Sequence, residues 1–192
     1  MTQAREDAWI ETYNGHRFHV YDLDTNVYDV DDIATSLSRL CRYNGHTRRF
    51  YSVAEHCVVM HDWVERQPWS TPMDCLTTLH HDDAEYIIGD LARPIKLEMP
   101  DFKAKETEID VAISREFGTI YPFPDWLKQL DAAMLDVERR QVLKPSGNTW
   151  QLNVDLDVSD IRLLGYMGTF SWYVKMQWLK RHYKCMRLIN KG

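Results

Sequence analysis

Apolar residues recur at helical spacing along most of the chain. The first predicted helix covers residues 30–43 and ends at Asn44-Gly45, and its apolar positions are Ile33, Leu37, Leu40 and Cys41. Ser52 and Glu55 form a capping-box pattern, which predicts a second helix to about Glu65. His56 would then lie in the first turn of that helix, beside the core.

Four further helices are predicted downstream. Thr71-Pro72 is a start signal for a helix carrying Leu76, Leu79, His81 and Asp82, in a region closed by Gly89 and Pro94. Two others cover residues 101–117, with Gly118 as the stop, and about 125–143. The last, over about 169–189, carries Trp172, Met176, Leu179 and Tyr183, and we expect its aromatic side chains to lie in the core or between copies of the chain.

The remaining segments are short. Asn14-Gly15, flanked by β-prone residues, predicts a small N-terminal hairpin. The helical signal fades over residues 144–168, which could form a loop or a short pair of strands. We therefore expect an all-α single domain over residues 1–192, a compact helical bundle with a core at about 30–143 and a final helix at about 169–189.

Composition agrees with an intracellular globular protein. The 192 residues are 44% hydrophobic and 27% charged, and they suffice for one sizeable core. No apolar run approaches the ~20 residues of a membrane span, and the start lacks a signal peptide, so we expect a cytoplasmic protein. The four cysteines include no CxxC pair and are expected to be buried thiols; His182 and Cys185 share a helical face but have no second pair for zinc.

The formal net charge of −6 argues against long nucleic acid as a partner, because phosphate polymers select broad basic surfaces. A single nucleotide needs only a local cluster of cations and a metal ion. Candidates close to the motifs below are Arg39, Arg42, Arg48, Arg49, Arg93 and Lys96.

Metal-ligand and acid/base residues are concentrated in "LHHDDAEYIIGD". His81 and Asp82 are adjacent, and Glu85 and Asp90 follow within one short segment. Other helices must supply further ligands, for which His56 and Asp131 are candidates. Two imidazoles and two carboxylates suit a first-row divalent cation with positions open for water and substrate. Asp136 is a rival of Asp131, but the two lie roughly 140° apart around one helix, so one cation is not expected to reach both.

These segments resemble the HD-domain phosphohydrolases, including 5'-deoxynucleotidases and small phage-encoded dATP triphosphohydrolases. The resemblance runs from about residue 33 to 143 through "LSRLCRYNGH", "YSVAEHC", "LHHDDAEYIIGDLARPIK" and "LKQLDAAM". It implies a divalent transition metal such as Co, Mn or Zn, with additional Mg on the phosphates. The implied ligands are His56, His81, Asp82 and Asp131. Glu85 would be the catalytic acid or an electrostatic helper, and Asp90 would orient the attacking water.

The same resemblance suggests the substrate. Arg42 and Tyr43 stand where deoxynucleotidases place an Arg-aromatic pair against sugar and base, although relatives have Trp where this chain has Tyr43. Pro94 and Lys96 are similar to residues that line the base pocket and meet the outer phosphates. The implied activity is hydrolysis of a small deoxynucleotide, with dATP favoured, in the cytoplasm (a host's, for a phage protein) and in a homo-oligomer.

Three alternatives remain open at this point. A 5'-deoxynucleotidase would hydrolyse monophosphates with the same residues. A di-iron oxygenase would need further histidine ligands, for which His61 and His80 are available. A non-catalytic nucleotide-binding module would leave Glu85 and Asp90 without a role.

Overall fold

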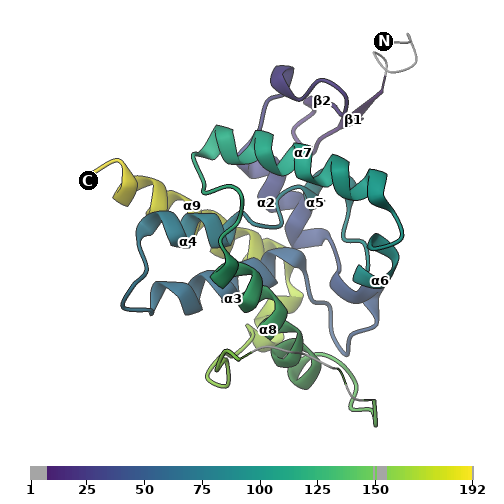
Figure 1. The fold of residues 1–192 in the computed structure, drawn as a ribbon, viewed down its shortest axis with the longest axis vertical. Coiled ribbons are helices and arrows are strands. Elements are labelled where there is room, and N and C mark those ends of the chain that lie inside the picture. Colours follow the sequence, from purple (N-terminus) through teal and green to yellow (C-terminus); the bar gives the residue numbers. More distant parts are fainter. Residues whose placement is uncertain (1–7, 149, 151–154, 192) are drawn as a thin grey trace.

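The computed structural model describes residues 8–148, 150 and 155–191, and within them eight α-helices follow a two-stranded hairpin (Figure 1). The hairpin is β1 (Trp9–Glu11) and β2 (Arg17–His19). The helices are α2 (Val30–Arg39), α3 (Val53–Glu65), α4 (Pro72–Leu79), α5 (Glu85–Ile88), α6 (Arg93–Lys96), α7 (Pro100–Phe117), α8 (Asp125–Gln141) and α9 (Ser171–Ile189), with 3-10 turns η1 (Leu23–Thr25), η2 (Arg42–Gly45) and η3 (Gly165–Thr169). The predicted all-α fold with an N-terminal hairpin is confirmed.

The hairpin is fastened to the start of α2. Ile10 pairs with Phe18 across the antiparallel strands, and Phe18 is buried in the core. The buried carboxylate of Asp32 accepts hydrogen bonds from the Thr12 hydroxyl (2.6 Å) and the Asn14 backbone N–H (2.7 Å). Gly15 turns the chain with φ of +82°, a conformation that glycine adopts without strain. The hairpin is therefore anchored by both apolar burial and a buried acceptor.

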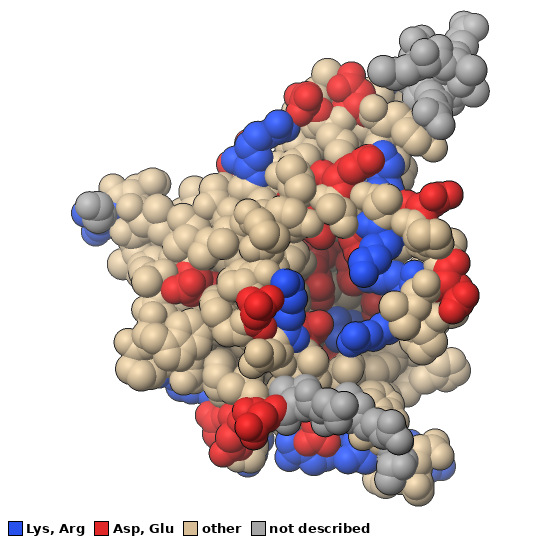
Figure 2. All heavy atoms as spheres, viewed as in Figure 1, with Lys and Arg blue, Asp and Glu red and all other residues tan. Residues whose placement is uncertain are grey.

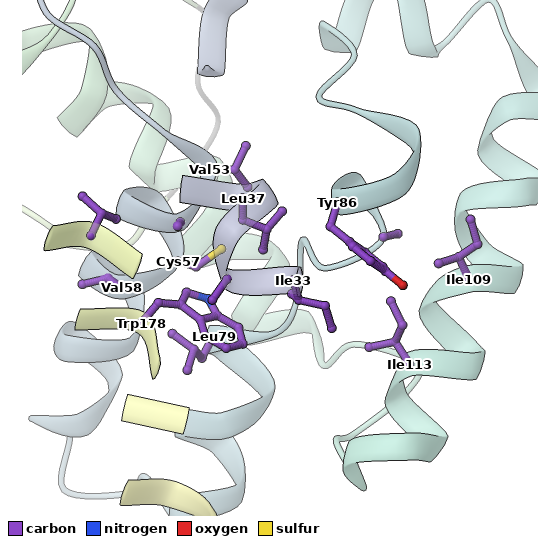
Figure 3. Packing of buried hydrophobic residues seen from close by; sticks show 14 of the residues in the cluster. Ile33, Leu37, Val53, Cys57, Val58, Leu79, Tyr86, Ile109, Ile113 and Trp178 are labelled. Atoms are coloured by element: carbon purple, nitrogen blue, oxygen red, sulfur yellow. The ribbon is translucent and has the colours of Figure 1, made fainter. Parts of the chain in front are cut away.

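Helix α3 is the centre of the fold, and almost every residue in it is buried. It contributes to two apolar clusters. One joins α2, α5, α7 and α9 around Ile33, Cys57 and Trp178 (Figure 3), and the other joins α4, α8 and α9 around Met60 and Leu130. A helix that is buried on nearly every side needs partners all round it, which explains why the remaining helices pack around α3.

The N-terminus of α3 follows only half of the predicted capping box. The Ser52 hydroxyl accepts a hydrogen bond from the Glu55 backbone N–H at 3.1 Å. The Glu55 carboxylate does not return to Ser52; it forms two hydrogen bonds with Arg49 and accepts a third from the Leu164 N–H. Glu55 thus ties the start of α3 to the segment before α9.

His81 and Asp82 do not lie in a helix, which corrects the prediction. The Thr71 capping box starts α4 as expected, but α4 ends at Leu79, and residues 80–84 form a turn before α5. Within that turn the His80 ring bonds the Asp83 carboxylate at 2.5 Å. This tertiary arrangement of buried polar groups overrides the helical tendency of the local sequence.

The C-terminal part agrees with the predicted final helix and differs from expectation in which of its side chains are buried. Described residues between 144 and 168 form no strand, and α9 begins at Ser171. The face of α9 turned to the core carries Val174, Trp178, His182 and Cys185. Trp172 and Tyr183 are more than half exposed, so their predicted core packing is wrong, while a role between copies of the chain stays a prediction. Met176 is exposed as well, whereas Leu179 packs against the core. Among the described residues, no helix combines the length and apolar character needed to cross a bilayer.

Candidate metal centre

Three elements bring the predicted ligands together. His56 lies in the first turn of α3, His81 and Asp82 in the turn after α4, and Asp131 in α8. Potential ligand atoms of His56, His81 and Asp82 all lie within 4.8 Å of one another. The His56 Nε2 atom is 3.7 Å from Asp82 Oδ2 and 3.2 Å from Asp131 Oδ1, and His81 Nε2 is 3.3 Å from Asp82 Oδ1. This cluster can hold a metal ion.

Both imidazoles are held so that Nε2 faces the cluster. The Nδ1 of His56 bonds Glu138 Oε1 at 2.7 Å, and the Nδ1 of His81 bonds the Thr78 carbonyl at 2.8 Å. A carbonyl only accepts, so His81 Nδ1 carries the proton and leaves a lone pair on Nε2. Neither buried Nε2 atom has a hydrogen-bond partner in the described part of the chain. Fixing the second ring nitrogen in this way is how proteins orient histidine ligands.

Asp131 lies at the open side of the cluster, with its side chain 44% exposed. Burial opposes its ionisation, but His56, His81 and Arg42 outweigh burial and lower the pKa of Asp131 well below its usual range. The rival carboxylate, Asp136, forms ion pairs with Arg139 and Arg140 instead. The structure therefore brings Asp131 to the cluster and engages Asp136 elsewhere.

The structure adds one residue that sequence reasoning missed. Glu138 is fully buried and accepts hydrogen bonds from His56, from Tyr51 at 2.8 Å, and from Tyr43. Arg42 approaches both of its oxygens at 3.4 Å. Burial opposes ionisation, but Arg42 and His56 prevail and lower the pKa of Glu138 to about 2. Its seven-residue spacing from Asp131, two helical turns, was the available signal.

Glu138 and its neighbours also act on His56. Burial and the Arg42 charge disfavour a protonated ring, yet Glu138 and Asp131 raise the pKa of His56 to about 9. A cation bound at Nε2 would replace the proton that the carboxylates attract there. The site thus favours positive charge at this position, either as a proton or as a metal ion.

Glu85 and Asp90 lie on either side of Gly89, whose φ of +79° ends α5. Burial is the main cause that raises the pKa of Glu85 well above its usual range, followed by the charges of Asp82 and Asp90. Its buried Oε2 has no hydrogen-bond partner among the described residues. Burial likewise raises the pKa of Asp90, against the effect of Arg42. Both carboxyls therefore retain protons more readily than exposed ones.

A cavity of about 200 Å³ opens beside the ligands. Figure 2 shows a hollow near the middle of this face, with acidic atoms in its depth and basic atoms at its edge. Besides ligand residues, the lining comes from α5, α6, α7, α8 and the segment before α8, through Glu85, Lys96, Glu106, Asp110, Phe123, Leu127 and Lys128. The cavity is rich in carboxylates, so an anionic ligand would enter it together with cations.

Sequence comparison places the chain among known relatives. No family model matches it. Over 143 residues it is 32% identical to YfdR, an uncharacterized protein of Escherichia coli K12, in a match that covers 74% of this chain and 77% of YfdR. The chain belongs to the YfdR family. It is also 28% identical over 143 residues to RCAP_rcc00048, an uncharacterized protein of Rhodobacter capsulatus, covering 70% of this chain and 73% of that protein.

Of the basic residues that the sequence offered as phosphate-binding candidates, two lie close to the site in this YfdR-family chain. Arg42 lies 3.4 Å from Asp82, and Lys96 bonds Glu106 at 2.7 Å with Glu85 at 4.0 Å. The others differ in their surroundings: Arg39 stacks on Tyr13, Arg48 bonds the Gln141 carbonyl, Arg49 pairs with Glu55, and Arg93 is exposed.

The predicted substrate-binding residues also divide into those that lie near the site and those that do not. Tyr43 has a left-handed backbone with φ of +56°, and its hydroxyl bonds Glu138 while its ring lies 6.3 Å from that of Trp150. Pro94 is exposed on α6 and is not among the residues that line the cavity. Within the YfdR-family structure, Arg42 and Tyr43 are therefore connected to the candidate metal cluster, Lys96 lines the cavity beside it, and Pro94 does neither.

Proposed function

We propose that this protein is a metal-dependent phosphohydrolase of the HD superfamily that acts on deoxynucleotides. The observation that carries the proposal is the pair of buried Nε2 atoms of His56 and His81, which make no hydrogen bond within the described residues and lie beside the carboxylates of Asp82 and Asp131. Burying such groups without partners is costly, and a bound cation would remove that cost. The mixed nitrogen and oxygen ligands suit Co, Mn or Zn, with Mg accompanying the phosphates.

The chemistry proposed divides between the metal and the carboxyls. A divalent cation, when bound, lowers the pKa of a water molecule and neutralises charge on phosphoryl oxygens. Glu85, with its raised pKa, is suited to protonate the leaving oxygen, and Asp90 to accept a hydrogen bond from the attacking water. Arg42 contributes a fixed positive charge for the phosphate beside Asp82.

The resemblance to HD-domain enzymes favours dATP, with deoxyadenosine and either triphosphate or stepwise released phosphates as products. The cavity supports a role for the phosphate end of the substrate, since it is smaller than the roughly 300–1,000 Å³ of typical small-molecule sites. Tyr43 and Trp150 offer aromatic surface for the base. A 5'-deoxynucleotidase acting on monophosphates is the nearest alternative. We further propose that the enzyme is cytoplasmic and that it is a homo-oligomer. Sedimentation velocity would measure the oligomeric state.

A di-iron oxygenase draws no support from the histidines it would need. His80 bonds Asp83 and His182 through its two nitrogens, and His61 bonds Asp62 and contacts Cys185. His80 is thus engaged through both nitrogens, and His61 belongs to a separate group with Asp62 and Glu65 and not to the cluster around His56. A non-catalytic binding module would be recognised by tight dATP binding without turnover in the assay below.

The deciding experiment is a product assay. Purified protein is incubated with Co²⁺ or Mn²⁺ and with dATP, dADP, dAMP or another deoxynucleotide, and products are separated by chromatography. We expect hydrolysis that EDTA abolishes. Asp131→Asn should lose it, whereas Asp136→Asn, on the same helix but paired with arginines, should retain it. No turnover of any nucleotide would contradict the proposal.

The roles of Asp82 as a metal ligand and of Glu85 as the catalytic acid can be distinguished by separate measurements of metal content and turnover. Asp82→Ala should lose both bound metal and activity. Glu85→Ala should keep metal, measured by elemental analysis after gel filtration, and lose turnover by about 10²-fold or more, the usual contribution of a general acid. Equal loss of metal in both variants would reverse these roles.

A further inference from the structure

A buried chain of three polar side chains connects the ligand-bearing turn to the C-terminal helix. His80 and Asp83 flank His81-Asp82 in the sequence, and His80 Nδ1 bonds Asp83 Oδ2 at 2.5 Å. The other nitrogen of His80 bonds Nδ1 of His182, in α9, at 2.9 Å. All three side chains are at most 4% exposed.

The three polar side chains of His80, Asp83 and His182 lie in apolar surroundings. The His80 ring is 4.8 Å from the rings of both Phe117 and Trp178, and Trp178 stacks on His182 with an interplanar angle of 6°. Asp83 has one further buried oxygen with no hydrogen-bond partner among the described residues. Apolar residues of similar volume would pack here without the cost of desolvating three polar groups. The polar chain therefore contributes something other than burial.

Its position indicates what it contributes. Helix α4 ends at Leu79, and the turn at 80–84 is closed by backbone bonds from Asp83 N–H to the His80 carbonyl and from Glu85 N–H to the Asp82 carbonyl. The side-chain bond between His80 and Asp83 spans the same turn. Whatever fixes the His80 ring thus fixes the backbone from which His81 and Asp82 project.

We propose that His182 is a positioning residue for the metal cluster. Through His80 and Asp83 it sets the conformation of the turn at 80–84, so that His81 and Asp82 face His56. A residue 102 positions away from His80 thereby determines the geometry of two ligands without contacting the metal. This role rests on the metal site of the proposed function.

The test compares variants at His182. In His182→Asn the amide stands near the position of Nδ1 and can retain the bond to His80, whereas His182→Leu keeps an apolar volume and removes the bond. Val174→Ala, at an equally buried position of α9, is the control for lost packing. The probe is Co²⁺, titrated by its visible absorption, which reports affinity and coordination geometry together.

We expect His182→Leu to raise the Kd for Co²⁺ about tenfold, the lower end of the effect of outer-shell partners, and to alter the absorption spectrum. His182→Asn should stay within about threefold of wild type, and Val174→Ala should bind as wild type does. If His182→Leu does not fold, His182→Gln replaces it, because its amide stands near Nε2 rather than Nδ1.

Two results would overturn the positioning role: wild-type affinity in the variant without the bond, or an equal loss in Val174→Ala. A wild-type protein that takes up no Co²⁺ would overturn the metal site and this role together. A wild type that binds Co²⁺ but hydrolyses no nucleotide would contradict only the proposed activity.

Discussion

Glu138 holds the ring of His56, a proposed metal ligand, and helps to raise its pKa from outside the ligand cluster. It accepts the bond from His56 Nδ1 and two tyrosine hydroxyls, and it faces Arg42. Four groups from the first third of the chain thus depend on one carboxylate in α8. Such an acceptor influences both the stability of the fold and the basicity of the imidazole.

Glu138→Gln should therefore lower both the free energy of unfolding and the affinity for metal. An amide keeps the shape but removes the charge that pairs with Arg42, and breaking a buried pair costs about 3 kcal/mol or more in the free energy of unfolding. Urea denaturation measures that loss, and Co²⁺ titration should show an affinity lower by about 10- to 100-fold. Glu65→Gln, whose partner Lys184 is half exposed, should change unfolding by less than about 1 kcal/mol. Equal stability of the two variants would contradict this view of Glu138.

At this scale the sequence predicted which candidate ligand residues lie together better than it predicted the residues that support them. His56, His81 and Asp82 form the cluster that the motif suggested. Glu138 was missed because a lone Glu in an amphipathic helix is usually solvated, and only the fold shows that its face is turned to the core. Pro94 was predicted to line the base pocket because it matches a position in the HD-domain family, but its side chain does not line the cavity.

Among the elements, α3 and α9 are joined by ionic as well as apolar contacts. Asp62 forms two hydrogen bonds with Arg181, both at 2.6 Å, and it accepts another from His61. Burial opposes ionisation of Asp62, but His61 and Arg181 lower its pKa to about 2. The ordinary pKa of aspartate is 3.8, so the folded protein holds this proton more weakly than the unfolded chain does.

The sign of the pH effect follows. A lowered folded-state pKa adds stability above pH ~4, and this is lost as the pH falls from about 4 to 2. Asp62→Asn should therefore be less stable than wild type at pH 6, and the difference should shrink towards pH 3. Chemical denaturation at both values measures it. A stability difference that is independent of pH would show that packing, and not the ion pair, connects α3 to α9 here.

The sequence predicted the existence of the longer helices more accurately than their ends and their buried faces. The turn at 80–84 interrupts a pattern that reads as helix, because His80 and Asp83 bond each other in the core. In α9, large apolar residues occupy two faces, and the choice of Val174, Trp178 and His182 for the core depends on the shape of α3 and α4 beside it. Neither could be inferred from local periodicity.

At the scale of the whole molecule, the proposed metal site would couple the stability of the fold to metal binding. The proposed ligands come from α3, the turn at 80–84 and α8, which meet only in the folded chain. A cation that binds this folded state and not the unfolded one stabilises it by mass action.

Added Co²⁺ or Mn²⁺ should accordingly raise the Tm, and EDTA should reverse the increase. At about 100 times the Kd, the expected stabilisation is about 2.7 kcal/mol. Thermal denaturation followed by circular dichroism measures the shift, and Asp82→Ala supplies the control that should not respond. A similar increase in that variant would place the stabilising metal elsewhere, such as at the His16, Asp29 and Asp32 group.

The bonds to Glu138 also affect the order in which parts of the protein fold during synthesis. Its partners Arg42, Tyr43, Tyr51 and His56 precede it by 82 to 96 residues. A ribosome releases all four side chains long before α8 emerges, so the nascent N-terminal segment carries a cationic and a hydroxyl-bearing surface before the carboxylate that these side chains share is available; of the four, Arg42 also faces Asp82, which emerges earlier. We therefore expect co-translational folding of this half to stay incomplete until α8 leaves the exit tunnel.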